Sequence, residues 1–192
     1  MTLEIDDLLH QDLLSAKLGD GYISLGTKAS KACRVAWNMG NKLHALEKVK
    51  RFKKLSPTYI EKENPGFGSE WFCVATKSHP LVNKYKDKSF LECVNELNDY
   101  GLAGWYGDDG HLSKSTGTCF IHTECMSFDV VSEICEILTN KFKLKSKVHS
   151  YVGGVNKRKM HCIRLTKGSS NELMARTKDC MAKGMEYKNI YC

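Results

Sequence analysis

Two aspartates, Asp20 and Asp109, stand in the same local sequence 89 residues apart. Each is followed by a glycine and preceded by an apolar stretch with helical spacing, from Leu13 to Gly19 in one case and from Leu102 to Asp108 in the other. A single Asp-Gly step is an ordinary turn sequence. Its repetition behind the same kind of helix indicates that the two carboxylates share a function.

Small residues on both expected helices would let the two aspartates meet. Ser15 and Gly19 are four residues apart in the first, as are Ala103 and Gly107 in the second, and residues at that spacing share one helix face. If the helices pack along these stripes, their carboxyl ends lie side by side. Adjacent carboxylates repel each other unless a cation lies between them, and Mg²⁺ prefers such oxygen ligands. The pattern therefore predicts a divalent-metal site whose chemistry suits phosphodiester hydrolysis.

The repeat extends beyond the two Asp-Gly steps. Phe72 to Lys77 corresponds to His161 to Lys167 at an offset of 90 residues, and glycine turns around Gly66 and Gly154 are 88 residues apart. Three landmarks with nearly one offset indicate two related halves, which we place at residues 1–90 and 91–192.

Each half is expected to follow the order αββαββα, so that the fold class is α+β. Alternating side chains and turn residues predict four strands in each half. The expected strands are residues 22–26, 33–38, 58–62 and 70–76 in the first half and 111–114, 118–124, 145–152 and 160–166 in the second.

An amphipathic helix is expected in the middle of each half. In the second half it covers residues 127–141, with Ser127 as its N-cap. In the first half, the apolar face is expected to consist of Leu43, Leu46, Val49 and Phe52, with basic residues between them.

Positive charge is concentrated in parts of the chain. The 29 Lys and Arg residues against 22 Asp and Glu residues give a net charge of +7, which favours a polyanionic partner. Residues 137–171 contain nine of these cations and no carboxylate side chain, and a second basic cluster lies between Lys42 and Lys54. Lys143, Lys145, Lys147 and His149 would share one face of a strand. Such a row is typical either of a solvated edge strand or of a sheet that faces duplex DNA, and the basic surroundings favour DNA.

Other classes of protein are disfavoured by composition. Apolar runs are too short for a membrane span, and the acidic segment from Met1 to Asp7 lacks the apolar core of a secretory signal. The nine cysteines contain no C-x-x-C pair, which argues against a disulfide framework or a zinc site. We expect an intracellular protein that is not secreted, in the cytoplasm or, if organelle-encoded, in an organellar matrix.

The second motif, Leu102 to Gly110 (LAGWYGDDG), resembles the LAGLIDADG signature of intron-encoded homing endonucleases, and Leu13 to Gly21 resembles the looser form found in opening repeats. The resemblance also covers the strand–strand–helix order and the ending from Glu186 to Asn189. It implies a single-chain enzyme of two pseudo-twofold-related repeats, with a central pair of LAGLIDADG helices and saddle-shaped antiparallel sheets in the DNA major groove. Such enzymes cut both strands of a long site, using Mg²⁺ and leaving short 3′ overhangs.

The resemblance also implies roles for residues of the two motifs. Asp20 and Asp109 would be catalytic metal ligands that share two or three Mg²⁺ ions, and the carbonyls of Gly19 and Asp108 would be further ligands. The carboxylate of Asp108 would either tune one site or face solvent. Lys17 and Ser15 stand where the family prefers an apolar residue and glycine.

A lysine near the end of each repeat would polarise the attacking water or the scissile phosphate. Lys188 matches this position in the second half. In the first half Lys86 and Lys88 both qualify, and Lys88 is preferred. The proline that commonly follows this lysine is absent in both halves.

Readout of DNA bases is assigned to polar residues of the strands and their turns, on the face given by alternation. These residues are Ser24, Thr27, Lys28, Arg34, Asn38, Thr58, Lys62, Lys114, His122, Lys145, Lys147, His149, Arg158 and Arg164.

Two functions of different classes fit these features. The first is a monomeric, metal-dependent, site-specific endonuclease acting on double-stranded DNA. The alternative is a non-cleaving nucleic-acid binder of the same fold, either a maturase that binds intron RNA or a regulator. Retention of both Asp20 and Asp109 favours the endonuclease.

Overall fold

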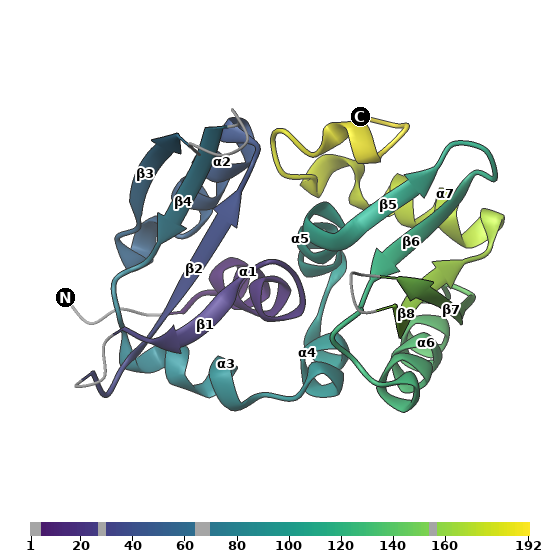
Figure 1. The fold of residues 1–192 in the computed structure, drawn as a ribbon, viewed down its shortest axis with the longest axis horizontal. Helices are drawn as coiled ribbons and strands as arrows, with labels where there is room; N and C mark the ends of the chain where they lie inside the picture. The colour runs from purple at the N-terminus through teal and green to yellow at the C-terminus, as the bar shows by residue number, and fades with distance from the viewer. Residues whose placement is uncertain (1–4, 27–29, 64–69, 154–156) are drawn as a thin grey trace.

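The computed structural model shows two four-stranded antiparallel sheets on either side of a central pair of helices, α1 and α5 (Figure 1). It describes residues 5–26, 30–63, 70–153 and 157–192. The helices are α1 (Asp7–Leu18), α2 (Lys42–Arg51), α3 (Asn83–Asp87), α4 (Phe90–Glu96), α5 (Asp99–Asp109), α6 (Phe128–Phe142) and α7 (Lys167–Thr177), with short 3₁₀ turns η1 (Lys53–Leu55), η2 (Pro80–Val82), η3 (Lys178–Cys180) and η4 (Glu186–Lys188).

The two sheets have the same topology, which confirms the α+β repeat. Their strand orders are β1-β2-β4-β3 and β5-β6-β8-β7. The strands are β1 (Tyr22–Leu25), β2 (Cys33–Met39), β3 (Thr58–Glu63), β4 (Glu70–Ala75), β5 (Gly110–Ser113), β6 (Thr118–His122), β7 (Ser146–Gly153) and β8 (Arg158–Leu165). The glycines at 66 and 154 that marked the repeat lie outside the described residues.

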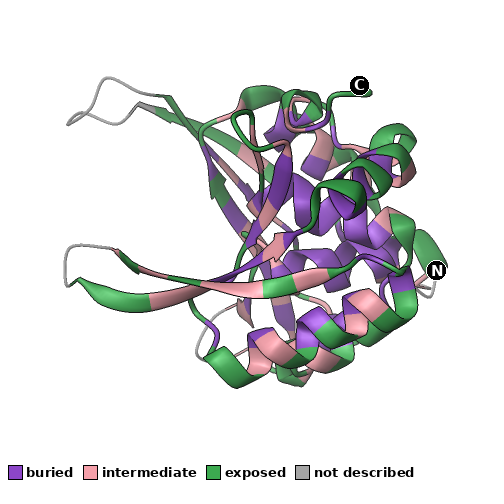
Figure 2. Ribbon diagram, turned by 90° about the vertical axis from the view of Figure 1, so that its right-hand side faces the viewer, coloured by how far each residue is buried: buried purple, intermediate pink, exposed green. Residues whose placement is uncertain are grey.

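Each sheet has one buried face and one open face, because successive side chains of a strand point to opposite sides. The core face of the first sheet includes Val35, Trp37 and Val74, which are at most 1% exposed. The core face of the second sheet includes Ile121 and Ile163, which are equally buried. The helices pack against these core faces. Figure 2 shows the buried helical layer on one side and the more exposed strands projecting on the other.

Side-chain caps start the helices at the points where polar residues precede apolar ones. Asp6 accepts a hydrogen bond from the backbone N–H of Leu9 at 2.9 Å, and Asn98 accepts one from Gly101 at 3.0 Å. Ser127 caps α6 through the N–H of Val130, as its position predicted.

Two local predictions were wrong. In α2 the predicted apolar face is turned partly outward: Leu43 is 60% exposed and Leu46 is 43% exposed, whereas Phe52 is buried. The predicted row of four strand cations is shorter, because Lys143 adopts a left-handed conformation at the C-cap of α6 and β7 begins only at Ser146.

Among the described helices, none is long and apolar enough to cross a bilayer.

Candidate active site

The motif helices α1 and α5 pack against each other through small residues. A Cβ atom added to Gly104 would lie 2.7 Å from Ser15 Oγ, and one added to Gly19 would lie 2.7 Å from Asp108 Cβ. The contact stripe of α5 therefore contains Gly104 and Asp108, and the predicted stripe of Ala103 and Gly107 was wrong. Gly107 faces the C-terminal segment, because a Cβ there would meet only Met185, at 3.9 Å.

This contact predicts opposite effects for two substitutions on the same helix. Gly104→Ala should lower the free energy of unfolding by about 1–2 kcal/mol, because the new methyl group overlaps Ser15 by more than the gain in helix propensity offsets. Gly107→Ala has room and should leave stability unchanged or raise it by up to about 1 kcal/mol. Urea denaturation of both variants measures the difference. Equal stability of the two variants would contradict the packing described here.

The packing brings Asp20 and Asp109 together, since each directly follows a member of the Gly19–Asp108 contact. Asp109 is the last residue of α5, and Asp20 follows the C-cap of α1. Burial and the nearby charges of Asp20 and Asp108 raise the pKa of Asp109 to about 8. The pKa of Asp20 is raised as well, by desolvation and by Asp108. The desolvation of Asp20 is only partial, because the residue remains accessible at the protein surface.

This donor set fits a hard divalent cation. The negative charge of Asp20 raises the pKa of Asp109, and a cation bound beside both carboxylates would stabilise their ionised forms. Within the described ranges, no three His, Cys, Asp or Glu side chains converge as a metal cage. The protein side therefore offers two carboxylates and backbone oxygens, which leaves coordination positions for water and phosphate oxygens, as Mg²⁺ prefers.

The Lys188 side chain lies at the same helix end. Its ammonium group donates hydrogen bonds to the carbonyl oxygens of Gly107 at 2.8 Å and Asp108 at 2.9 Å. Burial lowers its pKa against the opposing effect of Asp108, Asp20 and Asp109. Tyr106 fixes the backbone there by donating its hydroxyl to the Lys188 carbonyl at 3.0 Å. Because the Asp108 carbonyl already accepts from Lys188, a metal ion would have to share that oxygen.

The structure does not bring the first-half lysine to this site. The ammonium group of Lys88 pairs with Glu96, whose carboxylate also lies 3.4 Å from His10 Nε2. His10 lies eight residues before the end of α1 at Leu18, which corresponds to about 12 Å along the helix axis. Lys86 is held through its carbonyl, which accepts a hydrogen bond from Lys17.

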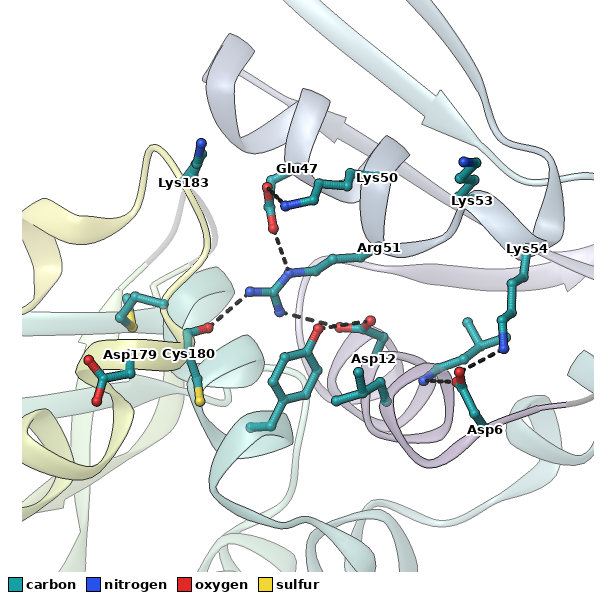
Figure 3. Close-up of a pocket in the computed structure, with 14 residues that line it drawn as sticks. Asp6, Asp12, Glu47, Lys50, Arg51, Lys53, Lys54, Asp179, Cys180 and Lys183 are labelled. Atoms are coloured by element: carbon teal, nitrogen blue, oxygen red, sulfur yellow. Dashed lines mark hydrogen bonds and ion pairs between the residues drawn. The ribbon is translucent and has the colours of Figure 1, made fainter.

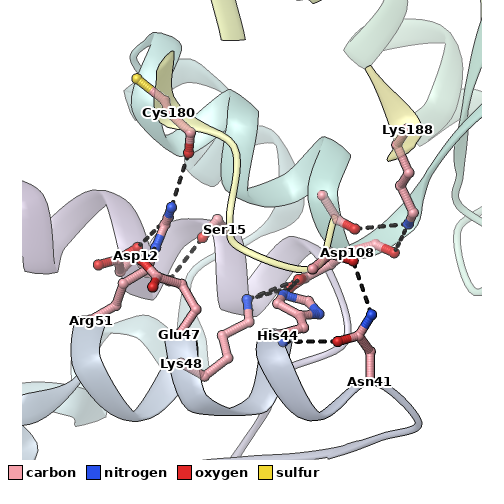
Figure 4. Close-up of polar contacts among 12 residues, drawn as sticks. Asp12, Ser15, Asn41, His44, Glu47, Lys48, Arg51, Asp108, Cys180 and Lys188 are labelled. Atoms are coloured by element: carbon pink, nitrogen blue, oxygen red, sulfur yellow. Dashed lines mark hydrogen bonds and ion pairs between the residues drawn. The ribbon is translucent and has the colours of Figure 1, made fainter. Parts of the chain in front are cut away.

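A different lysine, Lys48 of α2, reaches the motif helices instead (Figure 4). Its ammonium group donates to both carboxylate oxygens of Asp108, at 2.8 and 2.9 Å, and His44 Nε2 lies 3.2 Å from Asp108 Oδ1. The Asp108 side chain is fully buried. Burial alone would raise its pKa, but Lys48 and His44 lower it to about 2. Asp108 is thus a buried anion that links the two halves, and it does not face solvent.

Sequence reasoning missed His44 and Lys48 as residues of the site. Their spacing of four residues places them on one helix face, and both are buried. That spacing was the available signal, but the apolar residues of α2 pointed to another face. Their burial becomes favourable only because Asp108, 60 residues further along the chain, supplies the opposite charge.

A second polar cluster joins the halves on the same side of the helix pair, where Arg51 of α2 meets Asp12 of α1 and Tyr100 near the start of α5 (Figure 3). The Arg51 guanidinium lies 3.3 Å from Asp12 Oδ1 and donates to the Cys180 carbonyl at 2.9 Å. Tyr100 donates its hydroxyl to Asp12 at 3.2 Å and lies beneath the guanidinium. Arg51 is also held by Glu47 within α2.

The sequence suggested that the basic cluster between Lys42 and Lys54 is a free cationic surface. In the structure it is not. Four of its six cations pair with carboxylates of other elements: Lys42 with Glu61, Lys48 with Asp108, Arg51 with Asp12 and Lys54 with Asp6. The pairs of Lys48 and Arg51 are buried and join the two halves, whereas those of Lys42 and Lys54 are half-exposed. The sheets are therefore the main candidate nucleic-acid surface.

Of the residues predicted to read bases, those that the structure describes lie on or beside the open faces of the sheets. Register places Ser24 opposite Arg34 and Asn38 opposite Cys73, and it places Lys147 opposite Arg164 and His149 opposite Cys162. Thr58, Lys62, His122 and Arg158 have the same parity as these in their strands. Lys114 and Lys145 directly flank strands, and Thr27 and Lys28 lie outside the described residues.

A pocket of about 360 Å³ connects the open face of the first sheet with Asp20 and Lys188. Its lining includes Asp20, Asn38, Trp71, Asp108 and Lys188. Continuing the β1–β2 register places Asn38 opposite Asp20, and continuing the β5–β6 register places His122 opposite Asp109. The carboxylates therefore lie where the central helices meet the inner ends of both sheets.

Comparison with known proteins gives three concordant findings. A family model described as the LAGLIDADG DNA endonuclease family matches residues 17–173. The "Probable intron-encoded DNA endonuclease 3" of Mycosarcoma maydis is 32% identical over 95 residues, which cover 50% of this chain and 65% of that protein, just under two thirds of its length.

Solved structures share the fold across nearly the whole chain. The homing endonuclease I-WcaI bound to its DNA recognition sequence superposes with a TM-score of 0.78 at 21% identity, covering 98% of this chain and 87% of that one. I-DmoI in complex with DNA and Mn gives a TM-score of 0.53 at 13% identity, covering 92% and 97%. The N-terminal LAGLIDADG domain of WhiA also matches, with a TM-score of 0.52 at 9% identity over 92% and 86%.

Proposed function

Because the chain belongs to the LAGLIDADG DNA endonuclease family, we propose that it is a site-specific homing endonuclease that hydrolyses phosphodiester bonds of double-stranded DNA. The substrate is a long target site, cut in both strands with short 3′ overhangs, and Mg²⁺ is the metal. The proposed location is inside the cell, in the cytoplasm or an organellar matrix, where the protein would meet its DNA substrate.

One observation supports this proposal more strongly than any other. Asp20 and Asp109 converge at the end of two close-packed helices, between two sheets whose open faces hold the exposed polar and basic side chains. A non-cleaving binder would need the sheets but has no use for two carboxylates that repel each other and the phosphate backbone.

In this mechanism Asp20 and Asp109 hold the divalent ions. They would hold two or three Mg²⁺ ions, which would supply activation of water and stabilisation of the leaving oxygen. Lys188 donates to the carbonyls beside Asp109 and keeps a positive charge at the point where a scissile phosphate would lie. Lys48 holds Asp108 ionised and fixed, so that the helix end carrying Asp109 stays in place. Catalysis by Lys88 has no support from its position.

The single chain contains both halves of the site, and the proposal is therefore a monomer on duplex DNA. The open faces would lie in successive major grooves, with phosphate contacts fixing orientation and strand side chains reading base edges. Intron RNA is the alternative partner for the same surface.

Cleavage selection from a randomised duplex library in Mg²⁺ tests the proposal. We expect the protein to cut one long motif, and we expect a chelator to stop cutting while sequence-specific binding persists. The cut ends, sequenced on both strands, give the overhang. Tight, salt-sensitive binding without cutting under any divalent ion would contradict the enzyme and favour a maturase or regulator.

A further inference from the structure

The open faces of the two sheets differ in chemistry although their topology is the same. On the first sheet, Tyr22 is 70% exposed, Ile60 is 51% exposed and Trp71 is 40% exposed. Register places all three on the open face, since Tyr22 pairs with Ala36, Ile60 with Cys73 and Trp71 with Lys62. Charged groups among the described residues of this face are few, namely Arg34 and Lys62.

At the equivalent positions the second sheet has His111 in place of Tyr22, His149 in place of Ile60 and Met160 in place of Trp71. Among its described residues, no large apolar side chain of the open face is as exposed as those three. Cationic and imidazole groups occupy this face instead: His111, His122, Lys147, His149, Arg158 and Arg164.

Aromatic packing orients some of these donors. The ring of Phe120 lies beneath the Arg164 guanidinium, with 5.5 Å between the Arg164 Cζ and the ring centroid. The His149 ring meets Phe120 edge-on at 5.7 Å and stacks on Tyr151 at 6.2 Å. The apolar surface of Phe120 is thus covered by donor groups, whereas Ile60 and Trp71 on the first sheet are open.

Base edges in the major groove distinguish these two kinds of surface. Thymine offers a methyl group that favours apolar contact, and guanine offers the N7 and O6 acceptors that arginine and lysine contact in pairs. An imidazole N–H can also donate to N7. Exposed apolar side chains therefore select thymine, and oriented cations select guanine.

We propose that the two sheets read half-sites of different composition: the first sheet reads thymine-rich DNA through Ile60, Trp71 and Tyr22, and the second reads guanine-rich DNA through Arg164, Lys147 and His149. This inference rests on the proposed function, because it specifies the DNA that the same protein recognises. Ile60 and Arg164 are the specificity-determining residues that separate the two halves most clearly.

Base analogues in the selected target test the proposal directly. Uracil lacks only the methyl group of thymine, and 7-deazaguanine lacks only the N7 acceptor of guanine. Ile60→Ala and Arg164→Met are chosen as variants because both side chains lie on the open surface. Leu43→Ala, an exposed apolar residue of α2, and Lys53→Met, an exposed cation of η1, are their matched controls.

Repeating the selection with each variant assigns the half-sites. Ile60→Ala should relax positions in one half that are thymine in the original motif, and Arg164→Met should relax positions in the other half that are guanine. Uracil in the Ile60-dependent half should weaken binding about 4-fold for each methyl contacted, and this loss should vanish in Ile60→Ala. 7-Deazaguanine in the other half should weaken binding about 10-fold, and Arg164→Met should remove that loss. The control variants should behave like the original protein.

Three results would overturn the inference. Uracil could bind as tightly as thymine throughout, the two variants could relax the same half, or the positions that they relax could show no preference for thymine and guanine. The proposed function would survive each of these. A library from which no motif is selected at all would overturn the proposed function itself, and the inference with it.

Discussion

Replacing either motif aspartate by asparagine is expected to reduce DNA cleavage by about 10³-fold or more while leaving DNA binding intact. Asp20→Asn and Asp109→Asn each keep the side-chain volume but remove one of two carboxylates that would hold the divalent ions. Metal-ion stabilisation of the transition state is worth several kcal/mol, which corresponds to about three powers of ten in rate. Affinity for DNA should stay the same or rise, because each variant removes a negative charge beside the phosphates.

Single-turnover cleavage of the selected target and a binding titration in the same buffer measure the two effects separately. Asp87→Asn is the matched control, because it makes the same change at an exposed carboxylate of α3. It should cleave at the original rate. Unchanged cleavage by Asp109→Asn would refute the metal site, and loss of binding together with cleavage would point to a folding defect instead.

The second large effect is expected at the buried pair that joins the halves. Lys48→Met leaves the Asp108 carboxylate, whose side chain is fully buried, without its main counter-charge. Removing one partner of a buried ion pair costs about 3–5 kcal/mol, because the remaining charge stays desolvated. We therefore expect the free energy of unfolding to fall by this amount, a large part of the total stability of a typical domain.

A double variant keeps this prediction testable if Lys48→Met does not fold. Lys48→Met combined with Asp108→Asn removes both charges, and it should regain most of the lost stability. Lys50→Met makes the same change two residues away, at a side chain that is 74% exposed, and should alter stability by no more than about 0.5 kcal/mol. Urea denaturation of the three variants is the measurement. A loss in Lys50→Met equal to that in Lys48→Met would show that the pair has no special role.

Much of the fold was predictable because its signals are local. Alternating side chains locate strands such as residues 33–39 and set which of their residues face the core. The apolar face of α6 and its Ser127 cap are contained within some fifteen residues of chain. Repetition of the Asp-Gly step indicated that Asp20 and Asp109 form a pair, and the structure places the Lys188 side chain at the same helix end. These features depend on periodicity and on the resemblance, and both can be read along the chain.

The tertiary structure alone decided which charges were buried and which small residues met. In the sequence, Lys48 is one of several cations in the basic cluster between Lys42 and Lys54, and Lys88 is the preferred first-half lysine of the site. In the structure it is Lys48 that reaches the motif helices, because its ammonium group pairs with Asp108 of the second half. Lys88 pairs with Glu96 instead and does not reach the motif. A charged side chain is buried only where an opposite charge compensates for its lost hydration, and here that charge comes from the other half of the molecule. Composition and spacing determine which residues can do chemistry, whereas the pairing of distant charges depends on how the two halves pack.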